Sequence, residues 1–122
     1  MANVITDVGL GLITALLAAS DHKYVGWGTG TTTAAVADTS LETPSAESRT
    51  SGTQSQQTTT TSNDTYRCVA EIVATDTRAI TEVGIFSAST AGSMLMHADF
   101  AAVNLSSGDS IEFTINTVLD QA

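Results

Sequence analysis

The sequence predicts a mainly β protein, an antiparallel sandwich or jelly-roll-like fold with one amphipathic helix near the N-terminus. Three observations predict this class. From residue 65 onward, four runs alternate apolar and polar residues with a period of two, as strands with one buried face do. The segments TDTR, STAGS and SSGD supply turn residues between these runs. Residues 8–19 instead repeat apolar residues at helical spacing.

The predicted helix begins near Thr6 and Asp7, which supply an N-cap and an acidic first turn. Gly9 and Gly11 weaken its intrinsic propensity, so packing has to stabilise it. We expect it to cover an open end or one face of the sandwich. The apolar residues that recur at helical spacing are Val8, Leu12, Ile13, Leu16 and Leu17.

Residues 24–28 (YVGWG) predict a short strand that ends in a tight glycine turn, with Trp27 packed at the rim. Residues 29–63 then form a polar loop or arm of a single domain that spans residues 1–122. Within that arm, the density of threonine around residues 55–62 suits an extended strand with two polar faces, such as an edge strand.

The four later runs bring the expected number of strands to about six. In the second of them, Ile80, Glu82, Gly84 and Phe86 alternate with Thr81, Val83 and Ile85. In the third, Leu95, His97 and Asp99 are expected to face outward. The residues expected to share an inward face in the other runs are Tyr66, Cys68, Ala70 and Ile72; Met94, Met96, Ala98 and Phe100; and Ile111, Phe113 and Ile115.

Composition narrows the classes of partner. Four basic and thirteen acidic residues give a formal charge of −9 and a pI near 4.2. Nucleic acids and anionic membranes attract clustered Lys and Arg, which this chain lacks, so we expect neither as a partner. The single cysteine cannot form an internal disulfide, and the apolar stretch 8–19 is too short to span a bilayer. We therefore expect a soluble protein made in the cytoplasm of its host.

The glycine-rich stretch raises the question of phosphate binding. From Gly26 the sequence reads GWGTGT, which lacks the third glycine of a dinucleotide motif, and no lysine follows Lys23 to complete a P-loop. His97 and Asp99 share one strand face without a third ligand at a suggestive spacing, so we expect polar residues at the solvent or an interface. Cys68 is expected to be a buried, inert thiol. The sequence thus predicts no enzyme, no catalytic residue, no metal and no cofactor.

The combination of motifs resembles a known family. The helix leads into YVGWGTGTTT, then a spacer with DTSLET and a later ESR, and after some thirty residues ITEVGIF, a glycine turn and a closing GDS strand. This pattern is similar to that of small virion proteins of tailed bacteriophages, which carry tail-fibre-like or head-decoration labels. The resemblance covers about 100 residues of the chain. It implies a structural protein of the virion.

Within that class, we expect a capsid cement protein that binds the outer surface of the head and stabilises the shell by repeated contacts. Its partners would be the major capsid protein and further copies of itself. A tail component, such as a fibre base or an adaptor, is the alternative, and a glycan-binding module is a weaker one. The residues expected at the interface are Trp27, Thr29, Thr31, Thr32, Thr33, Leu41, Arg49, Thr59 and Thr61.

Overall fold

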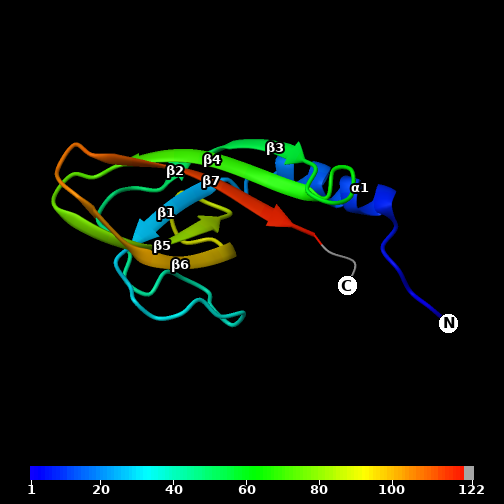
Figure 1. The fold of residues 1–122 in the computed structure, drawn as a ribbon, viewed down its shortest axis with the longest axis horizontal. Helices are drawn as coiled ribbons and strands as arrows, with labels where there is room; N and C mark the ends of the chain where they lie inside the picture. The colour runs from blue at the N-terminus through cyan, green and yellow to red at the C-terminus, as the bar shows by residue number, and fades with distance from the viewer. Residues whose placement is uncertain (120–122) are drawn as a thin grey trace.

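Two antiparallel sheets pack face to face, and one helix covers part of one sheet near its end, as the computed structural model shows for residues 1–119 (Figure 1). The predicted fold class is therefore confirmed, and the arrangement is a sandwich. The elements in chain order are α1 (Asp7–Ala18), β1 (Tyr24–Gly28), β2 (Thr50–Ser51), β3 (Thr53–Gln57), β4 (Thr65–Val73), β5 (Arg78–Phe86), β6 (Met94–Leu105) and β7 (Ser110–Val118).

The sheets have the strand orders β2-β1-β5-β6 and β3-β4-β7. β4 and β7 pair along their full length, from Thr65 opposite Val118 to Val73 opposite Ser110. β6 and β7 follow one another in the chain but belong to different sheets, so the turn between them crosses from one layer to the other. In these strand orders β6 and β7 each lie at an edge of their sheet.

The core lies between the two sheets and confirms most of the predicted faces. The buried apolar cluster comprises Val25, Trp27, Tyr66, Cys68, Ala70, Ile72, Ala74, Ile80, Val83, Ile85, Leu105 and Ile115. Burial raises the pKa of Tyr66 to about 12, and its hydroxyl donates a hydrogen bond to the His22 carbonyl at 2.6 Å. Burial also raises the pKa of the Cys68 thiol, which agrees with the inert thiol expected there. Trp27 is only 1% exposed, so its predicted place at the rim is wrong.

Two irregularities in the pairing of β5 with β6 alter the predicted faces. The register shifts between Ile80 and Glu82 and again between Ile85 and Phe86. At the second shift Phe86 pairs with Met94 and Ile85 pairs with Met96, which leaves Leu95 as an extra residue. Leu95 packs against the core, whereas strict alternation had placed it outward.

The orientation of α1 corrects the sequence prediction. Its start is as predicted, because the Thr6 hydroxyl accepts a hydrogen bond from the Gly9 N–H at 3.0 Å. The side chains that it buries are Leu10 and Thr14, with Leu17 partly buried against the core. The other residues of the predicted apolar face are exposed: Val8, Leu12, Ile13 and Leu16.

Hydrogen bonds explain why a polar face of α1 turns inward. The Thr14 hydroxyl donates to the Asn63 carbonyl at 2.7 Å, and the Gln56 amide on β3 donates to Gly11 O and Thr14 Oγ1. The Gln54 amide donates to the Leu17 and Ser20 carbonyls near the helix end. Polar contacts thus fix this helix on β3, a choice that apolar periodicity does not reveal.

The arm 29–63 contains more regular structure than expected. Residues 29–49 form a long loop, followed by β2, a strand that the sequence did not predict. β3 is an edge strand as predicted, but it covers Thr53–Gln57 instead of residues 55–62. Residues 58–63 are a turn, because the Asp64 carboxylate accepts hydrogen bonds from the N–H groups of Thr59, Thr60 and Thr61.

Candidate functional site

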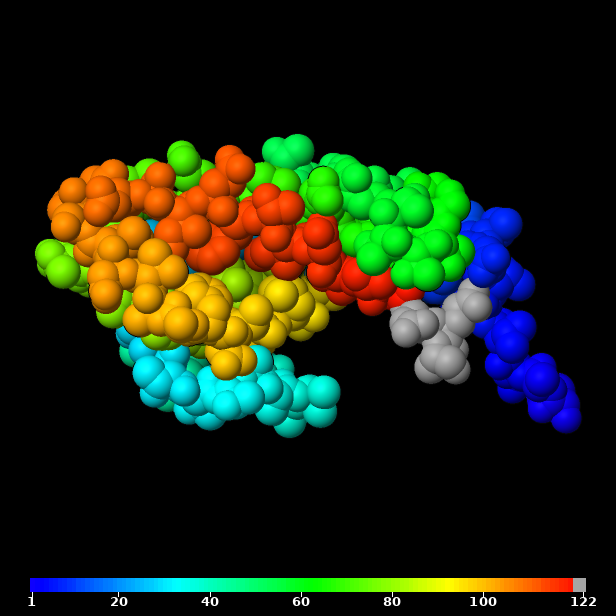
Figure 2. Space-filling model, in the orientation of Figure 1, coloured from blue at the N-terminus to red at the C-terminus, as the bar shows by residue number. Residues whose placement is uncertain are grey.

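The most elaborate side-chain arrangement lies where the glycine-rich stretch leaves β1. Residues 29–43 form a loop that is closed at its base by a hydrogen bond from the Thr29 N–H to the Thr43 carbonyl at 3.0 Å. Gly28 and Pro44 form an isolated bridge beside it. The loop, which we call the 29–43 loop, projects from the body of the molecule as the cyan segment in Figure 2.

A buried carboxylate lies at the base of the 29–43 loop, at the place where the glycine-rich stretch raised the possibility of phosphate binding. Glu82 on β5 is 1% exposed and accepts hydrogen bonds from the N–H groups of Gly30 at 2.8 Å, Glu42 at 2.9 Å and Thr43 at 2.9 Å. A Cβ atom at Gly30 would lie 2.4 Å from Glu82 Oε2. The backbone N–H groups of the loop therefore bind an anion, and the lack of a side chain at Gly30 leaves room for it. The anion is the Glu82 carboxylate of the same protein.

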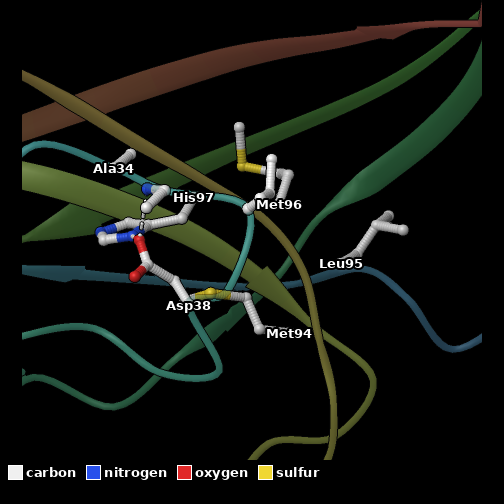
Figure 3. A pocket seen from close by; sticks show the side chains of 8 residues that line it. Ala34, Asp38, Met94, Leu95, Met96 and His97 are labelled. Carbon is white, nitrogen blue, oxygen red and sulfur yellow. Dashed lines mark hydrogen bonds and ion pairs between the residues drawn. The ribbon is translucent and has the colours of Figure 1, made fainter.

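His97 on β6 completes this cluster from the other side. Its Nε2 atom lies 2.8 Å from Glu82 Oε1, and its Nδ1 atom lies 2.7 Å from Asp38 Oδ2. The side chain is 7% exposed, so the prediction of a residue at the solvent or at an interface is wrong. The 29–43 loop covers the ring, and Asp38 near the loop tip reaches it directly, as the dashed line in Figure 3 shows.

The three groups hold one another in their charged forms. For Glu82, burial raises the pKa, but the N–H groups of Thr43 and Glu42, together with His97, outweigh it and leave the pKa below its ordinary value. For His97, burial favours the neutral ring, but the bonds to Asp38 and Glu82 raise the pKa above its ordinary value. The Ala35 N–H and then His97 lower the pKa of Asp38. An imidazolium between two carboxylates thus ties the loop to the sheet.

Two further carboxylates form hydrogen bonds near the loop, one at its tip and one in the segment that follows it. Asp99 accepts a hydrogen bond from the Ala34 N–H at 3.0 Å near the loop tip. After the loop, Glu47 accepts from Trp27 Nε1 at 2.8 Å and forms an ion pair with Arg78 at 3.1 Å. Burial opposes ionisation of Glu47, but hydrogen bonds from Ser45, Thr75 and Trp27 lower its pKa well below the ordinary range.

Arg49 is anchored in the same region. Its guanidinium lies 3.5 Å from the centroid of the Phe86 ring and donates to the carbonyls of Ala88 and Ala91 at 2.8 and 2.7 Å. The residue is half-buried, and burial lowers the pKa of its guanidinium. These contacts give Arg49 a structural role inside the chain, beside any role it has at an interface.

The remaining predicted interface residues divide by exposure. Trp27 and Leu41 are buried at 1% and 6% exposure, so they offer no accessible contact area. Arg49, Thr29 and Thr61 are half-buried. Thr31, Thr32, Thr33 and Thr59 are exposed, and the first three share the 29–43 loop. A contact between these threonines and a partner stays a prediction.

A shallow hollow of about 360 Å³ lies between the 29–43 loop and β6 (Figure 3). Its walls are mainly apolar, and His97 reaches it with both ring nitrogens already hydrogen-bonded to Asp38 and Glu82. Among residues 1–119, no group of three or more His, Cys, Asp or Glu side chains is arranged to hold a metal ion.

The sequence-based reasoning missed Glu82, Asp38 and Glu47 as organising residues. Each is separated by at least fifteen positions from one or more of the groups that it binds, so no local spacing relates them. One signal was present: Gly28 ends a short predicted strand and Gly30 follows it, with no helix after them, which indicates close approach of another group.

A second surface is apolar. The segment before α1 and one side of α1 expose large side chains, whereas the 29–43 loop exposes mainly Thr and Ala. In the described part of the chain, no helix has the length and apolarity needed to cross a membrane. The β-sandwich thus presents two different surfaces, the carboxylate-anchored 29–43 loop and the apolar side of α1.

Comparison with known protein families shows which class of protein this chain belongs to. A family model described as "Podophage GP4 fiber I protein gp80" matches residues 2–119, and the chain belongs to this family. It is a small structural protein of a bacteriophage virion, and its family is fibre-related. A comparison with curated proteins found no match.

Proposed function

We propose that this protein is a structural component of the fibre apparatus of a podophage tail, serving as a fibre base or adaptor. The observation that carries the proposal is the family match over residues 2–119, whose description is that of a fibre protein. The structure supports an adaptor because it offers two contact surfaces at different places, the 29–43 loop and the apolar side of α1. Such a protein joins neighbours by contact and needs no catalysis.

The partners in this proposal are other proteins of the particle and further copies of the same chain. Its charge of −9 disfavours nucleic acid, since phosphate binding requires clustered basic groups. Three of the four basic side chains, Arg49, Arg67 and Arg78, are engaged within the protein. The exposed threonines at Thr31, Thr32 and Thr33 supply hydroxyl groups for a polar contact.

A capsid cement protein is the second candidate. It is favoured by the small size, the acidic charge and the projecting threonine-rich loop, which suit repeated attachment to the outer surface of a head. The shell would then be stabilised through contacts with the major capsid protein. The two candidates place the same molecule at different sites of the virion.

The test is the number and position of copies in the purified particle. Quantitative mass spectrometry of virions should find at most a few tens of copies, and antibody labelling should place them on the tail. Hundreds of copies spread over the head would replace the fibre proposal with the cement function. Absence of the protein from purified virions would contradict both.

A further inference from the structure

Large exposed apolar side chains concentrate at the N-terminal end. Outside this region the exposed ones are isolated: Val36, Val73, Val103 and Val118. The N-terminal group consists of Met1, Val4, Ile5, Val8, Leu12, Ile13 and Leu16. On the helix, Val8, Leu12 and Leu16 are 75%, 63% and 72% exposed. A soluble monomer rarely leaves such a contiguous apolar patch uncovered.

The spacing on this side of α1 is that of a helix–helix seam. Val8, Leu12 and Ala15 follow one another on α1 at intervals of four and three, and all three are exposed. Ile5 before the N-cap and Ala19 at the C-cap continue this spacing and are also exposed. This is the repeat with which helices pack side by side, knobs into holes. No charged residue occurs between Asp7 and Asp21, although the chain carries thirteen acidic residues. The stretch from Val8 to Ala19 therefore carries no charge, and Asp7 lies at its N-terminal end.

A hollow for the knob of a second helix lies beside the seam. It measures about 370 Å³ and is lined by Asp7, Val8, Gly11, Leu12 and Ala15 of α1 and by Gln56, Ser62 and Asn63. Gly11 adds no side chain to this hollow, and a Cβ atom there would make an ordinary contact of 3.4 Å with the Asn63 side chain. The same helix thus presents projecting leucines and a recess, as a self-complementary interface requires.

The exposed surface is larger than that of a compact monomer. A compact monomer of 12.5 kDa exposes about 6,200 Å², whereas this chain exposes 6892 Å². Figure 2 shows the N-terminal segment extending from the body, which accounts for part of the difference.

We propose that the seam Val8–Leu12–Ala15–Ala19, with Leu16 beside it, is the surface through which copies of this protein associate. The occupant is α1 of a second copy. The chain itself offers the neutral, apolar, heptad-spaced helix that this face requires. The inference goes beyond the proposed function, because it holds for a protein at the tail or at the head.

The experiment is sedimentation equilibrium of the purified full chain and of two variants. The wild type should form a defined oligomer, and Leu12→Glu should raise the dissociation constant at least about tenfold, because it places a carboxylate in the seam. Val73→Glu is the matched control: it puts the same charge on an exposed valine at the end of β4, outside both contact surfaces, and should leave association unchanged. Circular dichroism should show all three folded, since Leu12 contributes little to the core.

Two outcomes would overturn the proposal: a wild type that remains monomeric at every concentration, or a Leu12→Glu oligomer with unchanged stability. In the first case the face would belong to a different protein of the particle. Neither outcome depends on where the virion carries the protein, so the copy-number experiment stands separately. A Leu16→Glu variant that also weakens association would support the seam at a second position.

Discussion

Glu82 is the residue through which the 29–43 loop is held to the sheet. Its two carboxylate oxygens accept from three backbone N–H groups and from His97, and the side chain is buried. A buried carboxylate is stable only when such donors replace the water that it loses. At the scale of single residues, the fold of the loop therefore depends on one negative charge.

Glu82→Gln is expected to lower the free energy of unfolding by about 3 kcal/mol, because the amide places N–H donors against backbone N–H donors and leaves the His97 imidazolium with Asp38 as its only carboxylate partner. The midpoint of thermal unfolding should fall by about 10 °C. Urea titration followed by circular dichroism measures the difference. Glu112→Gln, on the exposed side of β7, is the control and should change stability by less than about 0.5 kcal/mol. Equal effects of the two variants would contradict the role of Glu82.

His97 should make stability depend on pH near neutrality. Because its folded-state pKa is raised, its contribution is fully present below the ordinary value of 6.5 and is lost as the pH rises through the raised folded-state pKa. The free energy of unfolding of the wild type should therefore fall over that window. His97→Gln should remove this decrease, measured by urea titrations across the pH range, while His22→Gln should retain it. A wild type with constant stability across the window would contradict the imidazolium assignment.

The carboxylates give the opposite dependence at acidic pH. The pKa values of Asp38, Glu47, Asp64 and Glu82 all lie below their ordinary values, chiefly through hydrogen bonds that outweigh burial where burial opposes them. Their contributions are present above those ordinary values and are lost as the pH falls through the folded-state pKa values. The protein should accordingly be most stable between the acidic carboxylate window and the window of His97.

In the 29–43 loop, the backbone at Gly30 lies very close to Glu42 and Glu82. A Cβ atom at Gly30 would lie 2.6 Å from Glu42 Cβ as well as against Glu82. Gly30→Ala should therefore lower the free energy of unfolding by about 1–3 kcal/mol through overpacking. Gly11→Ala on α1 is the comparison, because its Cβ meets a contact of 3.4 Å and helix propensity should raise stability by about 0.5–1 kcal/mol. Thermal scans at high dilution, where association does not contribute, should give shifts of opposite sign.

The same contacts change what deletion of residues 29–44 would do. The sequence treats this segment as an arm that is separable from the sheet. Its backbone N–H groups, however, donate three hydrogen bonds to Glu82, so deletion would remove these donors and leave His97 as the remaining partner of this carboxylate. Substitution of the exposed Thr31 and Thr33 is the better way to test attachment of the loop to a partner.

How far the sequence predicts each element follows from the range of the interactions. β4 and β7 were predictable because alternation of apolar residues is local and one face of each strand is buried. The buried side of α1 was not predictable, since an apolar stripe and the stripe that contains Thr14 compete on that helix. The Thr14 stripe is buried because Thr14 accepts a hydrogen bond from the Gln56 amide and donates one to the Asn63 carbonyl. The position of Glu82 depends on Gly30, which lies 52 positions earlier in the chain.

At the scale of the whole molecule, the space between the two sheets opens to a hollow along the edge strands β6 and β7. Phe113 on β7 packs edge-on against Trp27, with ring centroids 6.3 Å apart, and lies 6.2 Å from the Phe100 ring. Phe113 is half-buried, because one side of its ring borders a hollow of about 420 Å³ along this seam. The apolar core therefore thins toward the β6–β7 side.

Phe113→Ala should lower the free energy of unfolding by about 3 kcal/mol, at the lower end of the range for a phenylalanine, because part of the ring already contacts solvent. Urea titration measures the loss, and Phe113→Leu should recover more than half of it. Val118→Ala on the same strand is the control, since that side chain is 46% exposed. A loss below that of Val118→Ala would show that Phe113 contributes nothing to the core.

Because of the net charge of the molecule, the salt dependence of the dissociation constant should distinguish an apolar interface from one made of ion pairs. Copies that each carry −9 repel one another, while the proposed seam on α1 contains no charge. Added salt shortens the screening length from about 30 Å at 0.01 M to about 8 Å at 0.15 M, so it should weaken the repulsion and leave the apolar contact intact. The dissociation constant measured by sedimentation should therefore fall as sodium chloride is raised over this range. An interface made of ion pairs would weaken instead, and that result would contradict assembly through Val8, Leu12 and Leu16.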